Sequence, residues 1–234
     1  MVPSSTDLPY EPRMRILALD GALARASAAV WAEGRVLSAS AAEGPRGQAV
    51  ALPPMVARVL AEAGLSATAL DAVASVVGPG GFTGLRAALA LAQGVALAIG
   101  RPAIGVTTGE ALAAALPEAL RAGHAVWSVI DTKRGRVLLE RFAPGAGAPL
   151  GPPEPFALAD LPVPEGPVAL VGDMAAEAAA ALAARGVAAV LTESRLPEAA
   201  AVAAVAALRL EGLLPPRAAL PLYVEAPAVR LPGA

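Results

Sequence analysis

The fold is decided by one stretch, Ala72-Val-Ala-Ser-Val-Val-Gly78-Pro79-Gly80-Gly81-Phe82-Thr83-Gly84-Leu85-Arg86. The short apolar segment before the glycines predicts a buried strand. The run that follows it, to residue 100, is rich in alanine and leucine and has the length of a helix. Ile104-Gly-Val106 then predicts the next strand. A strand, a glycine turn, a helix and a second strand together predict a right-handed parallel crossover.

The glycines of this stretch have two interpretations. Gly78, Gly80 and Gly81 allow unusual backbone angles and leave amides uncovered, so a turn of this kind before a helix can bind an anion. The specific phosphate motifs are not present, because Leu85 follows Gly84 where a P-loop needs Lys, and the third glycine of a dinucleotide motif is replaced. A turn packed for structural reasons and a phosphate cradle both stay open.

The segment 78–86 resembles GPGSFTGLR, a motif of the TsaB (YeaZ) family, with Gly81 in place of serine. Weaker resemblances follow in the family's order at 107–112, 131–137, 167–173 and 221–227, so that the resemblance covers nearly the whole chain. It implies an α/β protein with the actin-like ATPase (ASKHA) fold. That fold would have two related lobes with mixed sheets and a degenerate nucleotide site.

The order of the predicted elements agrees with that fold. A strand at 15–20 ends in an acid, a hairpin follows at 26–39, and a glycine turn comes after similar strands near 78 and 172. We expect a flexible N-terminal tail at 1–14. The N-terminal lobe, which would carry the dimer contact, takes 15–107 and 208–234, and the C-terminal lobe takes 108–207.

Composition limits the possible functions. The 234 residues are 56% hydrophobic and only 3% aromatic, which predicts a large core of small side chains. A net charge of −2 argues against nucleic-acid binding by the chain alone. There is no cysteine, and His124 is the only histidine, so a metal site is not expected. The start shows no signal peptide, and the apolar run 87–99 is too short for a bilayer, so we expect a soluble cytoplasmic protein without membrane contact.

The candidate cofactor-binding residues are few. Asp20 ends the first predicted strand and would hold a metal or water near phosphate, with Gly80 and Gly81 as the cradle. The alternative is a strand-end turn residue, since no second carboxylate offers a metal pair. The family usually has a hydroxyl after this acid, whereas Gly21 and Ala22 follow it here. We therefore predict no catalytic residue, no metal and no cofactor. The resemblance implies that ATP and a divalent metal are used by a partner subunit.

Two predicted helices are candidates for a partner interface. The helix at 48–63 has an apolar stripe, and the helix at 83–100 is apolar nearly all round, which leaves a second face to cover. The predicted interface residues are Met55, Val56, Val59, Leu60, Gly84, Ala88, Leu91 and Val95. Burial of this face within the protein is the alternative. Gln48 replaces a family histidine, and the pair Pro53-Pro54 replaces a single proline, so the first helix is expected to begin regularly at Pro53 or to kink there.

A small basic cluster lies in the predicted hairpin turn. Lys133, Arg134 and Arg136 could contact RNA phosphate or an acidic partner surface. The alternative is a solvated turn.

The resemblance implies a non-catalytic subunit. Such a protein would dimerise with the catalytic paralogue TsaD, or with itself when alone, and work with the ATPase TsaE. It would support threonylcarbamoyl transfer to N6 of adenosine 37 in tRNAs reading ANN codons, and would meet tRNA only within the complex.

Two other functions stay open. One is an actin-like-fold enzyme, either a phosphotransferase or a glycoprotease-type hydrolase. A single histidine and the lack of a G-x-S-x-G motif disfavour a protease. The other is an actin-like domain with an unrelated partner.

Overall fold

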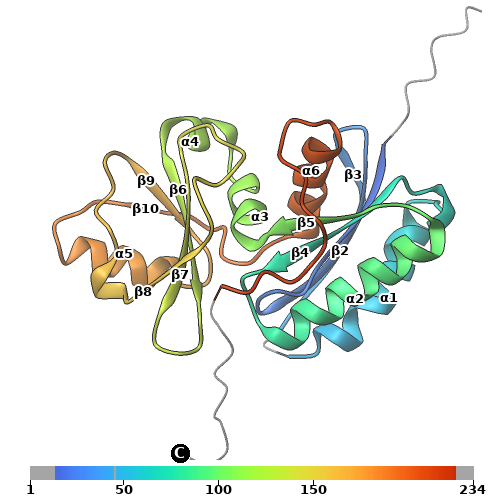
Figure 1. Ribbon diagram of the computed structural model, residues 1–234, viewed down its shortest axis with the longest axis horizontal. Coiled ribbons are helices and arrows are strands. Elements are labelled where there is room, and N and C mark those ends of the chain that lie inside the picture. Colours follow the sequence, from blue (N-terminus) through green and yellow to red (C-terminus); the bar gives the residue numbers. More distant parts are fainter. Residues whose placement is uncertain (1–13, 45, 225–234) are drawn as a thin grey trace, which may run out of the picture.

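The chain folds around two mixed β-sheets that form two neighbouring lobes (Figure 1). The structure is a computed structural model and describes residues 14–44 and 46–224. The predicted tail, apart from Met14, and the end of the N-terminal lobe at 225–234 lie outside the described residues.

The first sheet has five strands in the order β3-β2-β1-β4-β5. Its strands are β1 (Arg15–Asp20), β2 (Arg25–Ala32), β3 (Arg35–Glu43), β4 (Ala72–Gly78) and β5 (Ala103–Thr107). The first three are antiparallel, and β4 and β5 run parallel to β1. All of β4 is buried, as expected of a strand with apolar residues on both faces. The predicted hairpin and parallel crossover are confirmed.

The second sheet repeats this pattern. It has the order β10-β9-β6-β7-β8, so that reading it backwards gives the first sheet's order with every number raised by five. Its strands are β6 (Ala125–Asp131), β7 (Val137–Phe142), β8 (Glu154–Phe156), β9 (Val168–Val171) and β10 (Val190–Leu191). The antiparallel and parallel pairings also correspond. The two lobes are therefore related halves, as predicted.

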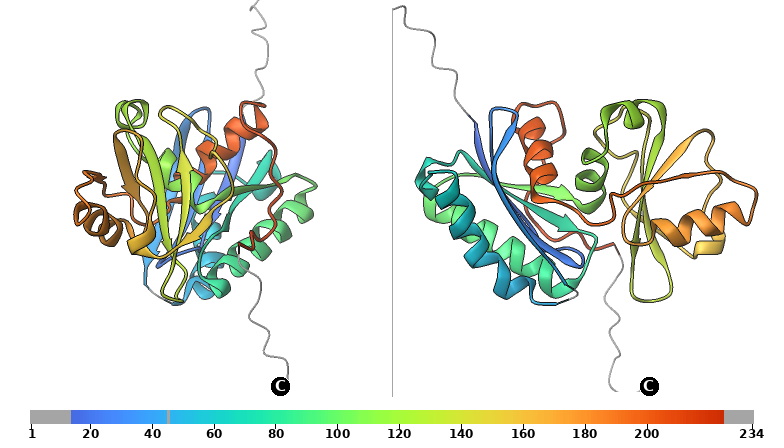
Figure 2. Two further views of the ribbon diagram at one scale, coloured as in Figure 1. Left: turned by 60° about the vertical axis from the view of Figure 1, so that its left-hand side comes forward. Right: turned by 180° about the vertical axis from the view of Figure 1, so that it is seen from behind.

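Helices cover both faces of the first sheet. The helices α1 (Gln48–Glu62) and α2 (Phe82–Ile99) lie side by side on one face, and α6 (Ala199–Leu210) lies on the other (Figure 2). Strand β1 shows why both faces need a cover. Leu17 and Leu19 pack with α1 and α2, whereas Ile16 and Ala18 pack with α6.

The remaining helices belong to the second lobe and to the junction. The helix α5 (Ala175–Ala183) packs on β9, and α4 (Glu118–Gly123) precedes β6. The helix α3 (Thr108–Ala114) contacts both β6 and α6. Two short 3-10 helices are η1 (Ala67–Ala69) and η2 (Leu158–Asp160).

The predicted lobe boundary at residue 207 needs correction. It falls inside α6, which is a single helix and packs against β1 and β2 of the first sheet. In the same way α3, which follows the first sheet, packs against the second. The helix that follows each sheet therefore packs against the other sheet, and α3 and α6 contact each other between the two sheets (Figure 1).

Two helices differ from expectation. The helix α1 begins at Gln48 and includes Pro53 and Pro54, so a regular start at Pro53 is wrong. Both prolines are exposed on the helix surface. Among the described helices only α2 is long and apolar enough to cross a membrane by length and composition, and here one side of it packs on β4 and α1. The elements α4, β8, β10 and both 3-10 helices were not predicted.

Candidate functional site

The acid at the end of β1 is sealed inside the protein. Asp20 is fully buried, and its Oδ1 accepts a hydrogen bond from the backbone N–H of Ala22 at 3.0 Å. Its other oxygen has no partner among the described residues. Burial raises the pKa of Asp20 to about 7, against the opposing effects of the backbone hydrogen bonds and of Arg25. These contacts favour the interpretation of Asp20 as a strand-end turn residue. Burial disfavours the charged form of its carboxyl group.

The glycine turn packs against the turn that follows Asp20. The N–H of Gly81 donates to the carbonyl oxygen of Ala22 at 2.6 Å. A Cβ on Gly80 would overlap that same oxygen, and a Cβ on Gly84 would overlap the carbonyl oxygen of Gly21. Glycine is needed here because two backbones touch. These contacts favour the structural interpretation of Gly80 and Gly81, since the chain's own carbonyl groups lie where a cradle would hold phosphate.

Most of the predicted interface residues lie in the core. Five of the eight are buried within the chain, namely Met55, Val56, Val59, Gly84 and Ala88. Three remain partly exposed, namely Leu60, Leu91 and Val95. The prediction is wrong for the buried five, because α1 and α2 pack on each other as well as on the sheet and so cover more of their surfaces than one stripe each.

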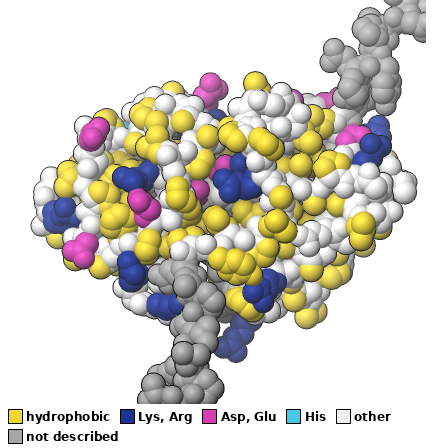
Figure 3. Space-filling view, viewed as in Figure 1, with side chains coloured by type: hydrophobic (Ala, Val, Ile, Leu, Met, Phe, Trp, Pro, Cys, Tyr) yellow, Lys and Arg dark blue, Asp and Glu magenta, His cyan; other side chains and the backbone are white. Residues whose placement is uncertain are grey.

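A different face of the two helices points outward. Its residues are apolar and exposed, and we call them the outer helix face: Val50, Pro53, Pro54, Ala57, Ala61, Ala90, Gly94, Leu97 and Ala98. Val50 is 81% exposed and Leu97 is 84% exposed. Figure 3 shows mostly hydrophobic and uncharged atoms over α2, at the lower right of the molecule. Contiguous exposed apolar patches are uncommon on monomeric proteins, and large ones mark interaction sites.

The basic turn between β6 and β7 is partly engaged within the chain. The Nζ of Lys133 lies 2.7 Å from Oδ2 of Asp131, and the guanidinium of Arg136 donates to the carbonyl oxygen of Pro155 at 2.9 Å. The side chain of Asp173 accepts from the N–H of Asp131 at 3.0 Å, which brings together two acids at the ends of β6 and β9. Among the described residues no group of three or more side chains is suited to hold a metal ion.

A polar cluster at the junction of the lobes was not predicted. Arg209 of α6 donates to Oε1 of Glu110 at 2.5 Å, and both side chains are nearly inaccessible to solvent. Thr107 caps α3 by accepting from the N–H of Glu110 and donates its hydroxyl proton to Oε2 of Glu140 at 2.9 Å. Glu140 follows three apolar residues in strand β7 and is the only acid in that strand, and this is the signal that the sequence offered.

The burial of Glu140 changes its chemistry. Desolvation raises the pKa of this carboxyl group to about 8, although the Thr107 hydroxyl opposes the shift. At neutral pH the group is therefore mainly neutral. The cluster as described binds the lobes together and also lines a cavity between them.

Part of the chain is similar in sequence to known proteins. A family profile described as "TsaD: tRNA N6-adenosine threonylcarbamoyltransferase" matches residues 44–142. The Escherichia coli K12 protein named "tRNA threonylcarbamoyladenosine biosynthesis protein TsaB" is 43% identical over 95 residues, which is 41% of this chain and 41% of that protein. The Maricaulis maris protein named "tRNA N6-adenosine threonylcarbamoyltransferase" is 43% identical over 77 residues, 32% of this chain and 20% of that protein. The matched segments thus span less than half the length of these curated relatives.

Solved structures match over almost the full chain. YeaZ from Pseudomonas aeruginosa has a TM-score of 0.72 and 28% sequence identity, and the match covers 90% of this chain and 100% of that one. A second Pseudomonas aeruginosa structure, described as similar to peptidase YeaZ, gives 0.73 and 27%, with 91% and 100% covered.

Two lobes of one mixed-sheet topology, joined by α3 and α6, define an actin-like protein with a sealed strand-end acid. The segment at 44–142 is TsaD-like, and the two Pseudomonas structures extend the likeness to both lobes. The chain is thus similar to proteins of the TsaB/YeaZ family along both lobes, which agrees with the resemblance of its motif at 78–86.

Proposed function

We propose that this chain is a non-catalytic subunit in the synthesis of N6-threonylcarbamoyladenosine in tRNA. Its role is to dimerise with a catalytic paralogue of the TsaD type and so support threonylcarbamoyl transfer to adenosine 37 of tRNAs reading ANN codons. The proposal places the chain in the cytoplasm, with the ATPase TsaE as a further partner. It is supported by the relatives that carry these names and by the outer helix face.

The outer helix face is the observation that carries the proposed dimerisation. Nearly every exposed side chain in the middle of α1 and α2 is apolar, with Arg58 and Glu62 as the charged residues on α1. Small residues such as Ala90, Gly94 and Ala98 would let a partner helix approach closely. The partly exposed Leu60, Leu91 and Val95 border this face and stay in the proposal. We expect a homodimer through this face when the chain is alone, and a heterodimer when the paralogue is present.

The enzyme alternative has less support in the geometry. A phosphotransferase needs open backbone amides and metal ligands at the phosphate turn. In this chain the amide of Gly81 donates to the carbonyl oxygen of Ala22, and Asp20 is buried with no second carboxylate among the described residues in a metal-binding group with it. We therefore assign no catalytic role to Asp20, Gly80 or Gly81, and place ATP and metal use in the partner subunits.

Direct tRNA binding is proposed to be weak and confined to the assembled complex. The basic turn would contribute contacts to phosphate, but Lys133 and Arg136 already have partners inside the chain. Any binding by the chain alone would fall steeply with added salt.

The test of the interface is a charge placed on the outer helix face. The variants Leu97→Glu and Val50→Glu replace side chains that are exposed in the single chain, so both should fold normally. Burying an unpaired carboxylate in a dimer contact costs several kcal/mol, so both variants should elute as monomers and fail to co-purify with the paralogue. Mass by light scattering and a pull-down with purified TsaD paralogue give the two readouts.

The matched control is Leu213→Glu, which changes another exposed leucine, 69% accessible and outside α1 and α2. This variant should still have the mass of a dimer and should still co-purify with the paralogue. If all three variants behave like the unchanged chain, the interface is not on α1 and α2.

A further inference from the structure

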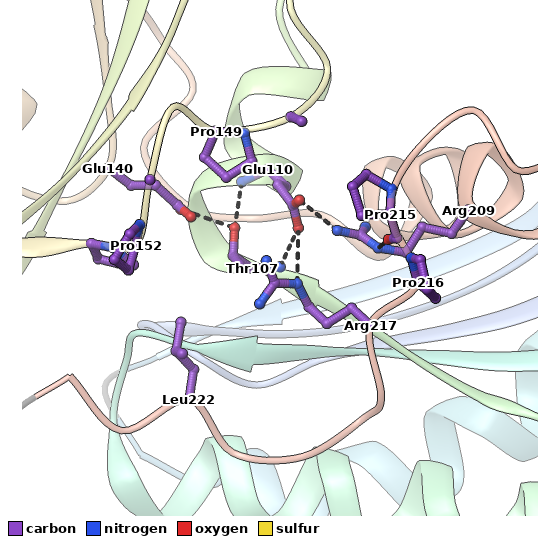
Figure 4. Close-up of a pocket in the computed structure, with 13 residues that line it drawn as sticks. Thr107, Glu110, Glu140, Pro149, Pro152, Arg209, Pro215, Pro216, Arg217 and Leu222 are labelled. Atoms are coloured by element: carbon purple, nitrogen blue, oxygen red, sulfur yellow. Dashed lines mark hydrogen bonds and ion pairs between the residues drawn. The ribbon is translucent and has the colours of Figure 1, made fainter.

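A cavity of about 350 Å³ lies between the two lobes (Figure 4). Glu140 of β7 and Glu110 of α3 enter it from one side, and Arg209 and Arg217 enter from α6 and the segment after it. Its other walls are mainly apolar and consist of proline rings and the side chain of Leu222. The cavity is thus polar at one end and apolar at the other.

Three polar atoms at this end have no hydrogen-bond partner among the described residues. They are Oε1 of Glu140, Nη1 of Arg209 and Nε of Arg217. The other oxygen of Glu140 accepts from Thr107, and Arg209 is otherwise paired with Glu110. Arg217 lies 4.0 Å from Oε2 of Glu110 and its side chain is 33% exposed, so it is held loosely. Buried polar atoms without partners are rare in proteins, and several in one cavity point to a ligand.

The protonation of Glu140 decides what kind of ligand fits. Glu140 is only 2% exposed, no cation among the described residues is in hydrogen-bond contact with its carboxyl group, and Glu110 faces it. A buried carboxyl group without a paired cation takes up a proton. The proton then resides on Oε1, because Oε2 is the acceptor for Thr107. All three unpartnered atoms are therefore donors, and the two arginines outnumber the one other acid that lines the cavity, Glu110.

We propose that this cavity binds a small organic carboxylate. The ligand's carboxylate accepts hydrogen bonds from Arg217, Arg209 and the protonated Glu140, and its apolar body lies against the prolines and Leu222. The site is separate from the turn after Asp20 and from the outer helix face, so it does not depend on the proposed function.

The probe is 4-phenylbutyrate, titrated into the full-length protein and followed by calorimetry and by amide chemical shifts. Its uncharged amide and inorganic phosphate are the comparison ligands. We expect saturable binding with a dissociation constant of about 1 mM or tighter, because small ligands gain only a modest binding free energy per non-hydrogen atom. The amide, which lacks the charge, and phosphate, which lacks the apolar body, should each bind at least about tenfold more weakly. The shifts should centre on Thr107 and Glu110.

Variants separate this site from nonspecific binding. Arg217→Met keeps the length of a partly exposed side chain and should abolish the saturable signal, whereas Arg101→Met, an exposed arginine outside the cavity, should leave it unchanged. Glu110 and Arg217 are the charged groups that face Glu140. Affinity for the probe should fall about tenfold from about pH 7 to about pH 9 as Glu140 ionises, and Glu140→Gln should remove most of that dependence.

The proposal is overturned by any of three results. These are no saturable binding of the carboxylate, equal binding of its amide, or binding that Arg217→Met leaves intact. A pH profile of Glu140→Gln that runs parallel to that of the unchanged chain would likewise exclude the donor role of Glu140.

Discussion

At the scale of single residues, the glycine motif has a packing role. Gly80, in the turn before α2, and Gly84, in the first turn of α2, stand where the backbone meets the loop after β1, and the residues they touch are Ala22 and Gly21. The sequence predicted that glycine was required at this turn. It could not show what filled the space, because the contact joins segments about sixty residues apart.

The first prediction concerns Gly80. In Gly80→Ala the new methyl group would overlap the carbonyl oxygen of Ala22, and neither loop can move without disturbing the other. Overpacking of this kind should lower the free energy of unfolding by about 1–3 kcal/mol. Urea denaturation measures the loss. The control is Gly123→Ala, where a Cβ meets nothing within 4 Å and the change should stay within about 0.5 kcal/mol.

The second prediction concerns Asp20. Its pKa is about 7 in the folded protein and near 3.8 when unfolded, so between these values the folded state holds a proton that the unfolded chain has released. The contribution of this residue to stability therefore falls as pH rises through this window. Asp20→Asn, which keeps the acceptor for Ala22, should gain stability relative to the unchanged chain as pH rises from about 4 to about 8, by at most about 4 kcal/mol. Parallel stability profiles of the two proteins would contradict the raised pKa.

At the scale of helices and strands, periodicity predicted most elements but not their neighbours. Strand β1 was predicted with its observed bounds, and α2 within one residue at each end. The sequence could not show which apolar face of α2 is buried and which is exposed, because alanine stripes fit a sheet, a neighbouring helix or a partner equally well. Elements of two or three residues, such as β8 and β10, depend on pairing with distant strands and leave no local pattern.

The third prediction tests the link between α3 and α6. Arg209→Met leaves Glu110 as a buried carboxylate without its main partner, which should cost about 3–5 kcal/mol of unfolding free energy. The control is Arg141→Met, which breaks an exposed pair with Glu154 and should cost about 1 kcal/mol or less. Thermal or urea denaturation compares the two. Similar losses in both variants would show that the buried pair does not hold the lobes together.

At the scale of the whole molecule, the chain crosses between its halves twice. The sequence indicated two related lobes, because a glycine turn recurs after similar strands near 80 and 172. It did not place α6 on the first sheet, since the packing of a helix on a distant sheet depends on the chain path and not on local pattern. The cavity with Glu140 was missed for the same reason, as its walls come from both halves.

The proposed function also belongs to the scale of the whole molecule: the chain would serve tRNA modification by dimerising with a catalytic partner and not by its own chemistry. The most direct measurement is the amount of N6-threonylcarbamoyladenosine formed on unmodified tRNA by a purified TsaD paralogue and its remaining components, determined by mass spectrometry of digested tRNA. Product should form when this chain or Leu213→Glu is added, and it should be lost with Leu97→Glu or when the paralogue is omitted. Equal amounts of product without this chain, or with Leu97→Glu, would show that the proposed dimer is not required.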